Sequence, residues 1–593
     1  MTQYAPQPQI SVLDAGGQYC HLIARKVREL GVYADVQPSD APAALLATRQ
    51  GVIISGGPMS VYAPGSPTVD AELFGAGVPV LGICYGLQLM AHMLGGQVER
   101  GEKGEFGLAY FDLARNAPLF KGFALGGREQ IWMSHRDTVR AVPPGFEALG
   151  STETCRFAAM ADTARRLYGV QFHPEVVHTC RGREVLENFV FGVCGCAKDW
   201  NPKNRIPLIT ERIHEVVGDR NVFFFVSGGV DSSVAYTLCL RALGPDRVRG
   251  IYVDTGLMRE GETEFVRHTF DRVAPGTVYI ESAEARFLGA LTGVREPERK
   301  RLIIGEEFVR VQEEIIDSGH FAEGDWILGQ GTIYPDTIES GGTKNAALIK
   351  THHNRVEGIQ RLIETGRVIE PLSSFYKDEV REIGEELALP PELLRRHPFP
   401  GPGLAIRCLC SDGAHDITQC ADGWLIPIHS VGVQGDERSY RPVLALEKLP
   451  AEDAGFEGAT ALINRIAGIN RVMALVESPF PLASLRVQDS ALSAERLARL
   501  RRADAVVRRL SRDSGFDESV WQFPVVLVPL GGAERPDSVV LRPIDSTDGM
   551  TARSVPMDAT LLATMSHELL QIAGVAAVFY DLTHKPPATI EWE

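Results

Sequence analysis

The first residue whose surroundings suggest chemistry is Cys84, in the segment Gly82-Ile-Cys-Tyr-Gly86. The apolar run 78–81 comes before this segment and the helical pattern 87–94 follows it. Glycines on both sides of a cysteine permit a tight strand-to-helix turn that exposes the side chain at a helix N-terminus. There the helix dipole favours a thiolate, and backbone N–H groups can bind an oxyanion. For Cys84 taken alone, a buried and inert thiol is the alternative.

A base and a group that orients it are available in Phe172-His-Pro-Glu175. Residues two apart on an extended segment project to the same side, so Glu175 can fix the tautomer of His173. The turn Ser55-Gly-Gly-Pro58 follows another apolar run and could present a second oxyanion donor. Together with Cys84 these segments meet the requirements for nucleophilic catalysis.

A second chemical centre is indicated by Ser227-Gly-Gly-Val-Asp-Ser-Ser233, which follows the apolar run 221–226 and precedes a helical pattern. Small residues between a strand and a helix let backbone N–H groups converge on a phosphate. The segment lacks the Gly-Lys-Ser/Thr of a Walker A loop. For the glycine pair alone, a turn without a ligand is the alternative.

The elements that must position these residues are arranged as alternating short apolar runs and helical patterns. Such alternation predicts an α/β fold with parallel sheets covered by helices. We expect one domain at 1–198, a second at 199–406 and a third, α+β region at 407–593. Prolines and glycines at His397–Gly403 end the second pattern, because they sustain neither a helix nor a central strand.

The third region contains a weak internal repeat. The string 466–472 (IAGINRV) resembles the string 572–578 (IAGVAAV), and a helical pattern and a strand pair precede each of them. The similarity predicts a duplicated β-β-α-β unit, over about 424–480 and 520–593. Chance similarity remains an alternative, because only two copies of a short string are seen.

The composition limits the class of protein. A chain of 593 residues suggests about three or four domains. The net charge of −16 argues against a general nucleic-acid binder, which needs clustered Lys and Arg. There is no apolar run of membrane-spanning length and no signal-peptide pattern, so we expect a cytoplasmic protein without a nucleic-acid or membrane partner. The scattered cysteines, and the pair His352 and His353, lack metal-site spacing.

Residues 10–195 resemble the class I glutamine amidotransferases through the Cys84 elbow and the His173 and Glu175 segment. The resemblance implies that Cys84 attacks the glutamine side-chain amide while His173 moves protons. The residues that it implies for the oxyanion and for glutamine are Gly57, Tyr85, Gln88, Ser134 and His135.

The segment 227–233 resembles the PP-loop of the ATP pyrophosphatases, which have a doubly wound parallel sheet. The resemblance implies that ATP is split to AMP and pyrophosphate with Mg²⁺, and that Asp231 is the link to the metal. The ATP-binding residues that it implies are Ser227, Gly228, Gly229, Val230, Asp231, Ser232, Ser233, Asp254 and Lys377.

Further segments resemble GMP synthetases, so that the resemblance covers nearly the whole chain. These segments are Gly329–Asp336, Lys350–Asn354, His397–Arg407 and Lys585–Glu593. The resemblance implies glutamine, ATP and xanthosine monophosphate (XMP) as substrates. The XMP-binding residues that it implies are Arg301, Asp436, Gln522, Lys585, Ile590 and Glu591.

Other functions remain open. The nearest alternative is another PP-loop ligase, such as a glutamine-dependent NAD synthetase or a thiolating enzyme. An inactive nucleotide-binding scaffold is the alternative from a different class, although it would need no nucleophile together with a base.

Shorter bacterial-type synthetases have one C-terminal repeat, through which two chains pair. Two repeats in one chain therefore predict a monomer with an internal pseudo-dimer, with a homodimer as the alternative.

Overall fold

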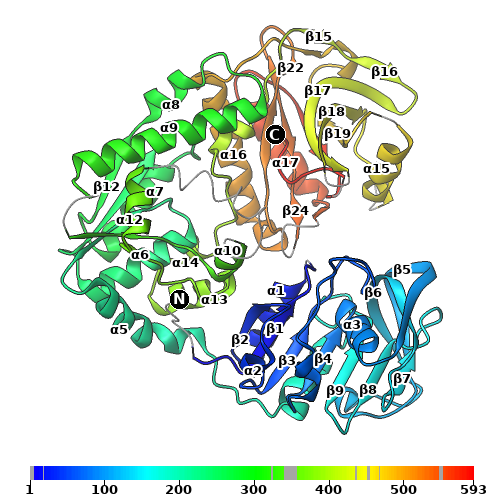
Figure 1. Ribbon diagram of the computed structural model, residues 1–593. Coiled ribbons are helices and arrows are strands. Elements are labelled where there is room, and N and C mark those ends of the chain that lie inside the picture. Colours follow the sequence, from blue (N-terminus) through cyan, green and yellow to red (C-terminus); the bar gives the residue numbers. More distant parts are fainter. Residues whose placement is uncertain are drawn as a thin grey trace. The chain divides into compact units, whose positions relative to one another are not determined.

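The computed structural model describes residues 6–17, 19–321, 325–339, 357–434, 437–450, 454–466, 468–546, 552–585 and 587–593. The chain forms two compact units, whose elements are labelled in Figure 1. Unit 1 consists of Met1–Arg212, Thr332–Ala346 and Leu372–Ile383. Unit 2 consists of Ile213–Gly331, Ala347–Pro371 and Gly384–Glu593. No helix in the described ranges is long and apolar enough to cross a membrane.

The sheet of unit 1 has nine strands, of which the first five in spatial order are parallel and the rest antiparallel. The strands in that order are β2 (Ala34–Pro38), β1 (Ile10–Asp14), β3 (Gly51–Ile54), β4 (Val80–Ile83), β9 (Leu167–Val170), β8 (Ala159–Asp162), β7 (Glu147–Ser151), β5 (Gln97–Leu113) and β6 (Arg128–Ala141). Helices α1 (Cys20–Glu29) and α4 (Gly182–Glu187) share one core with the sheet, and α3 (Tyr85–Met93) shares the other. Alternate residues of β1 and β3 belong to the two cores, as the period of a strand requires.

Two segments that we expected in the second domain, Thr332–Ala346 and Leu372–Ile383, belong to unit 1. The buried guanidinium of Arg28, on α1, explains this difference. It lies 4.7 Å from the ring centres of Tyr334 and Tyr376, and its Nη1 is 3.0 Å from Glu379 Oε2. A buried cation is stable only when it is paired and hydrogen-bonded, and these two segments supply the partners.

The parallel sheet of unit 2 has five strands in the order β12 (Val278–Ser282), β11 (Val248–Asp254), β10 (Asn221–Phe225), β13 (Trp326–Gly329) and β14 (Val368–Ile369). Strands that follow β10 in the chain are added first on one side of it and then on the other. The switch point of this doubly wound fold therefore lies beside β10. The segment 227–233 leaves the carboxyl end of β10 and enters α6 (Val230–Leu243). Ligands bind at such a switch point in open α/β sheets.

The second sheet of unit 2 contains the predicted duplication. Its strands are β16 (Thr418–Cys420), β17 (Gly423–Gln434), β18 (Glu437–Leu446), β19 (Arg471–Glu477), β26 (Val575–Asp581), β23 (Asp537–Leu541) and β21 (Val525–Val528), in spatial order. The first copy is β17, β18, α15 (Ala454–Arg465) and β19, and the second is β21, β23, α17 (Ala559–Leu570) and β26. The last strands of the two copies pair antiparallel, so the sheet has an internal pseudo-two-fold order.

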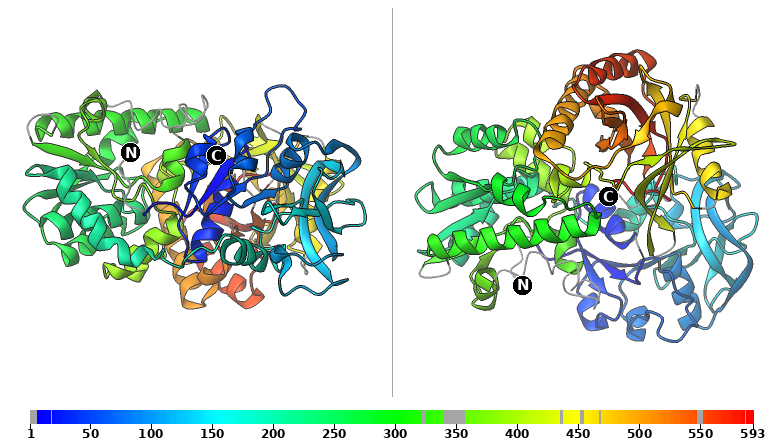
Figure 2. Two further views of the ribbon diagram at one scale, coloured as in Figure 1. Left: turned by 60° about the horizontal axis from the view of Figure 1, so that its bottom comes forward. Right: turned by 90° about the horizontal axis from the view of Figure 1, so that it is seen from above.

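The two faces of this sheet are covered differently. Buried residues of α15, α16 (Ala494–Asp513) and α17 share a core with one face. The other face packs against Leu482, Leu485, Val487 and Trp592. The strands appear in yellow and orange to red in both views of Figure 2. Both faces of the sheet therefore contribute to hydrophobic cores of unit 2.

Smaller elements complete the two units. The remaining helices are α2 (Ala43–Leu46), α5 (Ile206–Val217), α7 (Glu262–Val273), α8 (Glu284–Ala290), α9 (Pro297–Ser318), α10 (Tyr334–Glu339), α12 (Glu357–Glu364), α13 (Lys377–Glu386) and α14 (Pro391–Leu394). The remaining strands are β15 (His415–Asp416), β20 (Arg486–Val487), β22 (Leu530–Gly531), β24 (Ile544–Asp545) and β25 (Arg553–Ser554).

Candidate active sites

Cys84 lies on a strained turn between β4 and α3. Its φ of 53° and ψ of −104° are rare for a residue with a side chain, and such strain is concentrated at functional sites. A Cβ on Gly86 would lie 2.3 Å from the Ile54 oxygen, and a Cβ on Gly82 would lie 2.5 Å from the Gly86 carbonyl carbon. Both flanking positions therefore need glycine, and the turn holds the thiol at the N-terminus of α3.

The predicted contact between His173 and Glu175 is present. His173 Nδ1 lies 2.7 Å from Glu175 Oε1, and both side chains are buried. Burial lowers the pKa of His173, but the Glu175 carboxylate and the Cys84 sulfur outweigh burial and raise it well above its ordinary value. A Cβ on Gly56 would lie 3.1 Å from His173 Cε1 and 3.7 Å from Cys84 Cβ. The SGGP turn, His173 and Cys84 therefore meet at one point.

Two further residues, which the sequence analysis missed, hold the base in place. Thr179 donates from Oγ1 to the His173 carbonyl at 2.6 Å, and the same oxygen accepts from the Trp132 N–H. The ring of Tyr19 meets the His173 ring edge-on, with centroids 5.2 Å apart. A threonine or tyrosine in a loop carries no sequence signal of such a role, because the contact depends on segments far apart in the chain.

The residues implied for glutamine line the same region of unit 1, but two of their side chains are already engaged. Gln88 Nε2 donates to the Asp137 carbonyl at 2.8 Å and lies 3.2 Å from Gln171 Oε1. His135 lies between Glu105 Oε2, at 2.8 Å, and the Asp137 carbonyl, at 2.9 Å. The Cys84 thiol donates to the Ser134 carbonyl at 3.6 Å. His135 and Gln88 thus stabilise the wall of the site with their side chains.

The PP-loop segment of unit 2 forms an open turn at the N-terminus of α6. Gly228 has a φ of +73°, which favours glycine, and Ser227 Oγ accepts from the Gly229 N–H at 3.2 Å. Ser232 and Ser233 donate to the Gly229 carbonyl. The turn therefore leaves small side chains and a helix N-terminus at the switch point, an arrangement that binds phosphate.

Other residues implied for ATP are placed in different ways. Asp254 ends β11, where its carboxylate accepts from the Gly256 N–H at 3.0 Å and from the Thr263 hydroxyl at 2.7 Å. Asp254 thus shapes the loop that follows its strand. Asp231 lies in the first turn of α6. Lys377 is the first residue of α13, in unit 1, and its phosphate role stays a prediction.

The C-terminal tail is fixed deep in unit 2. Arg407 makes two hydrogen bonds to the Glu591 carboxylate, at 2.9 and 2.7 Å. Lys300 is fully buried, and its Nζ lies 2.6 Å from Glu593 Oε2. Arg301 donates to the Glu593 carbonyl. The resemblance implied a role for Arg301 but none for Lys300, because a lysine within a charged run is usually solvated.

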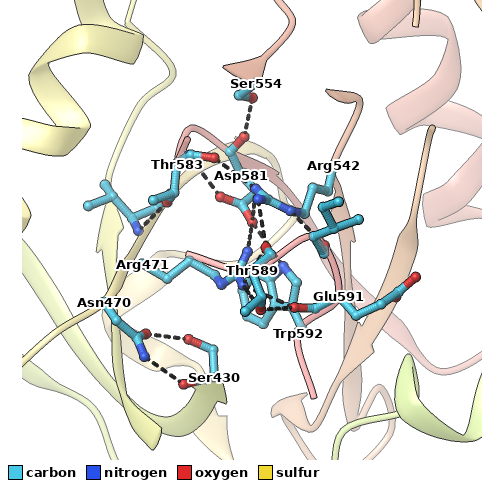
Figure 3. A network of polar contacts seen from close by, with 12 residues as sticks. Ser430, Asn470, Arg471, Arg542, Ser554, Asp581, Thr583, Thr589, Glu591 and Trp592 are labelled. Atoms are coloured by element: carbon cyan, nitrogen blue, oxygen red, sulfur yellow. Dashed lines mark hydrogen bonds and ion pairs between the residues drawn. The ribbon is translucent and has the colours of Figure 1, made fainter. Parts of the chain in front are cut away.

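A network around Asp581 anchors the same tail (Figure 3). Arg471 Nη1 lies 2.6 Å and Arg542 Nη1 lies 2.8 Å from Asp581 Oδ2, and all three side chains are fully buried. Trp592 Nε1 donates to the same oxygen at 2.9 Å. Arg542 Nε also donates to the Ile590 carbonyl at 2.9 Å. These bonds join β19, β26 and the tail into one rigid element.

The other residues implied for XMP are found on the same unit. Gln522 Nε2 donates to the Pro398 carbonyl at 2.7 Å, and among the described residues its buried Oε1 has no hydrogen-bond partner. The backbone of Lys585 pairs with that of Ala552. Asp436, and the segment with His352 and His353, lie outside the described residues.

Comparison with known proteins identifies the family. A family model described as glutamine amidotransferase class-I matches residues 11–193, and one described as GMP synthase C terminal domain matches residues 510–592. A Leptospira interrogans protein described as "Probable GMP synthase, glutamine-hydrolyzing" is 41% identical over 99% of this chain and 99% of its own length. GMP synthases of Caldicellulosiruptor saccharolyticus and Thermomicrobium roseum are each 40% identical over 98% of this chain and cover 99% and 96% of their own lengths. The chain belongs to the glutamine-hydrolysing GMP synthases, which are ligases of guanine nucleotide biosynthesis.

Proposed function

We propose that unit 1 hydrolyses glutamine through Cys84, His173 and Glu175, and the contact of His173 with Glu175 carries this proposal. The Cys84 sulfur attacks the side-chain amide carbon, and His173 gives its proton to the leaving ammonia. Glu175 keeps the imidazole oriented and stabilises its charged form. The backbone N–H groups of Gly57 and Tyr85 stabilise the oxyanion. Water then hydrolyses the thioester and releases glutamate.

Unit 2 activates the acceptor, XMP, with ATP. The backbone of the 227–233 loop and the dipole of α6 hold the phosphates of ATP. The C2 oxygen of XMP attacks the α-phosphorus, and the bond to the bridging oxygen of the β-phosphate breaks, so that pyrophosphate leaves with the electron pair. Ammonia attacks C2 of the adenylated XMP, and AMP leaves to give GMP.

The loop and α6 fit a magnesium ion. Their side-chain donors are oxygens: the Asp231 carboxylate and the hydroxyls of Ser227, Ser232 and Ser233. Mg²⁺ prefers oxygen ligands and phosphate partners. When bound, it neutralises charge on the phosphates. We assign Asp231 as the residue that holds it.

The residues of unit 2 implied for XMP include groups suited to a purine nucleotide. Gln522 Oε1, which has no hydrogen-bond partner among the described residues, can accept from a ring N–H. Glu591, held by Arg407, can accept from a ribose hydroxyl or a ring N–H. Arg301 and Lys585 suit the phosphate. This set favours XMP over the acceptor of an NAD synthetase, in agreement with the family.

The test uses purified full-length protein with Mg-ATP, either glutamine or ammonium, and either XMP or nicotinic acid adenine dinucleotide. Formation of AMP and of the aminated product is followed for each acceptor. We expect GMP from XMP with both nitrogen sources and no NAD from the other acceptor. Product from the dinucleotide alone would overturn the assignment of the acceptor.

We also propose that the protein is a monomer in the cytoplasm. The edge of β19 that could pair with another chain is paired with β26 of the second copy. Arg471 of the first copy binds Asp581 of the second. In a dimer of identical chains each contact would occur twice, related by the two-fold axis. All ten cysteines are free thiols, as is usual in a reducing compartment. A stable dimer in sedimentation, at twice the 64.8 kDa chain mass, would contradict the monomer.

A further inference from the structure

A buried arginine that no sequence motif indicated, Arg259, lies on the loop after β11. The loop is held from two sides. Arg501 donates to the carbonyls of Met258, at 3.0 Å, and of Gly256. On the other side the Leu404 N–H donates to the Leu257 carbonyl at 2.7 Å. The backbone that carries Arg259 is therefore fixed at the carboxyl edge of the parallel sheet, where α/β sheets bind nucleotides.

Among the described residues, the guanidinium of Arg259 lacks the hydrogen bonds that a buried cation needs. The side chain is 8% exposed, and its nearest acidic partner is Asp504, with Nε and Oδ2 3.6 Å apart. That distance is too long for a hydrogen bond. Asp504 is 1% exposed, and within the described ranges neither of its carboxylate oxygens nor Arg259 Nε has a hydrogen-bond partner. Such groups are costly to bury unless a ligand completes them.

Two other arginines of unit 2 show how a guanidinium pairs with a carboxylate near Arg259. Arg396 donates to the Gly228 carbonyl of the PP-loop, at 3.2 Å, and to the Glu262 carboxylate, at 2.5 Å. Arg407 makes its two bonds to Glu591 of the C-terminal tail. Both have carboxylate partners within hydrogen-bond distance, whereas in the described part of the chain Arg259 has no carboxylate closer than Asp504, at 3.6 Å.

Arg259 lies between the ATP side and the acceptor side of unit 2. Its guanidinium is 4.4 Å from the ring centre of Phe399, and Arg407 is 5.2 Å from the same centre. Burial lowers the pKa of Arg259 to about 10 in spite of Asp504, and the charges of Arg508, Arg407 and Arg396 add to this effect. The neighbouring arginines therefore disfavour the charge of Arg259, and an anion bound beside it would offset this effect.

We propose that Arg259 binds the phosphate that is transferred, first as the α-phosphate of ATP and then as the phosphate of the adenylated acceptor. The proposal rests on the function proposed for unit 2. As the acceptor oxygen bonds to the α-phosphorus and pyrophosphate leaves, negative charge stays on the non-bridging oxygens. Arg259 donates its unused N–H groups to these oxygens, as a guanidinium can do with a phosphate. Asp504 is a positioning residue. Its carboxylate attracts the guanidinium of Arg259 but leaves the N–H groups of Arg259 available to the phosphate.

The experiment measures pyrophosphate formation in a single turnover of the full-length enzyme with XMP and Mg-ATP and without a nitrogen source. The variants are Arg259→Gln, Arg259→Lys, Asp504→Asn and, as a matched control on the surface of α16, Arg509→Gln. We expect Arg259→Gln to slow pyrophosphate formation by about 100-fold, the usual loss for one transition-state donor. Equilibrium binding of XMP and glutaminase activity should be unchanged, as should all activities of Arg509→Gln.

The two other variants separate a chemical role from a structural one. Arg259→Lys keeps the charge and should recover part of the rate, and Asp504→Asn keeps the guanidinium and should lose less than Arg259→Gln. A wild-type rate in Arg259→Gln would overturn the proposal. Equal losses in Arg259→Gln and Asp504→Asn would also overturn it, because the ion pair alone would then be what matters. Failure of the wild type to form pyrophosphate with XMP would instead reject the proposed function.

Discussion

The two chemical centres of this protein differ in how far the protein alone completes them. In unit 1 His173 lies 2.7 Å from the Glu175 carboxylate, and Cys84 is held on a strained turn beside it. In unit 2 the buried cation Arg259 has no such close contact, because its Nε lies 3.6 Å from Asp504 Oδ2. Both centres contain buried oxygens without a hydrogen-bond partner among the described residues, Glu175 Oε2 in unit 1 and Gln522 Oε1 in unit 2. A covalent mechanism needs its nucleophile and base assembled beforehand. Transfer of a charged adenylyl group uses the charge of the substrate to complete the site.

The replacement Cys84→Ala should have the largest effect. It removes the nucleophile, so GMP formation from glutamine should fall by more than about 1000-fold. Formation of GMP from ammonium should stay within about twofold, because unit 2 is unchanged. Initial rates with each nitrogen source provide the measurement, and Cys155→Ala, another buried thiol of unit 1, is the control. Loss of both activities in Cys84→Ala would show that the two centres are not separable.

The replacement Glu175→Gln should lower glutamine hydrolysis by about 100- to 10,000-fold, since the amide cannot stabilise a charged imidazole. Glutamate release measures the loss, and Glu153→Gln, at an exposed position, is the control. An unchanged rate would mean that His173 is oriented by other groups.

The same pair makes the stability of unit 1 depend on pH. The folded protein raises the pKa of His173, with burial opposing and Glu175 and Cys84 favouring the charged form. The stabilisation is therefore fully present below the ordinary pKa of histidine and is lost as the pH rises through the folded-state value. The gap in melting temperature between wild type and Glu175→Gln should narrow as the pH rises. A gap that widens would contradict this sign.

The replacement Asp581→Asn tests the rigid part of the second centre. It leaves Arg471 and Arg542 buried without their shared carboxylate, which should cost about 3–5 kcal/mol of unfolding free energy. Denaturant unfolding measures this, and ammonium-dependent GMP formation should fall with it while glutamine hydrolysis remains. The control is Asp545→Asn, whose exposed pair with Arg553 should contribute at most about 1 kcal/mol. Equal effects of the two replacements would contradict the account of the network.

The smallest effect is expected for Ser493→Ala. Ser493 caps α16, the helix that carries Asp504, by accepting from the Arg496 N–H at 3.2 Å. Loss of such a cap costs about 1 kcal/mol. Thermal unfolding measures the change, and Ser484→Ala, an exposed serine of the same unit, is the control. A large loss of activity without a loss of stability would show that the cap also positions the active site.

Much of both centres could be predicted from local sequence. The Cys84 elbow depends on glycines within two residues of it, and His173 and Glu175 meet because they are two apart on one segment. The PP-loop lies between a strand and a helix that are its immediate neighbours. The repeat was visible because each copy has the same order of elements, although the strings themselves are short.

Tertiary structure decided the contacts between residues that are far apart in the chain. Arg28 draws Tyr334, Tyr376 and Glu379 into unit 1, and Lys300 binds Glu593, 293 residues away. The pairing of Arg259 with Asp504 has no counterpart in any motif. By itself the sequence determined the local turns at Cys84 and at residues 227–233, because their geometry is set by neighbouring residues. Only the folded chain decided which buried charges meet, because such pairs have neither a period nor a fixed spacing.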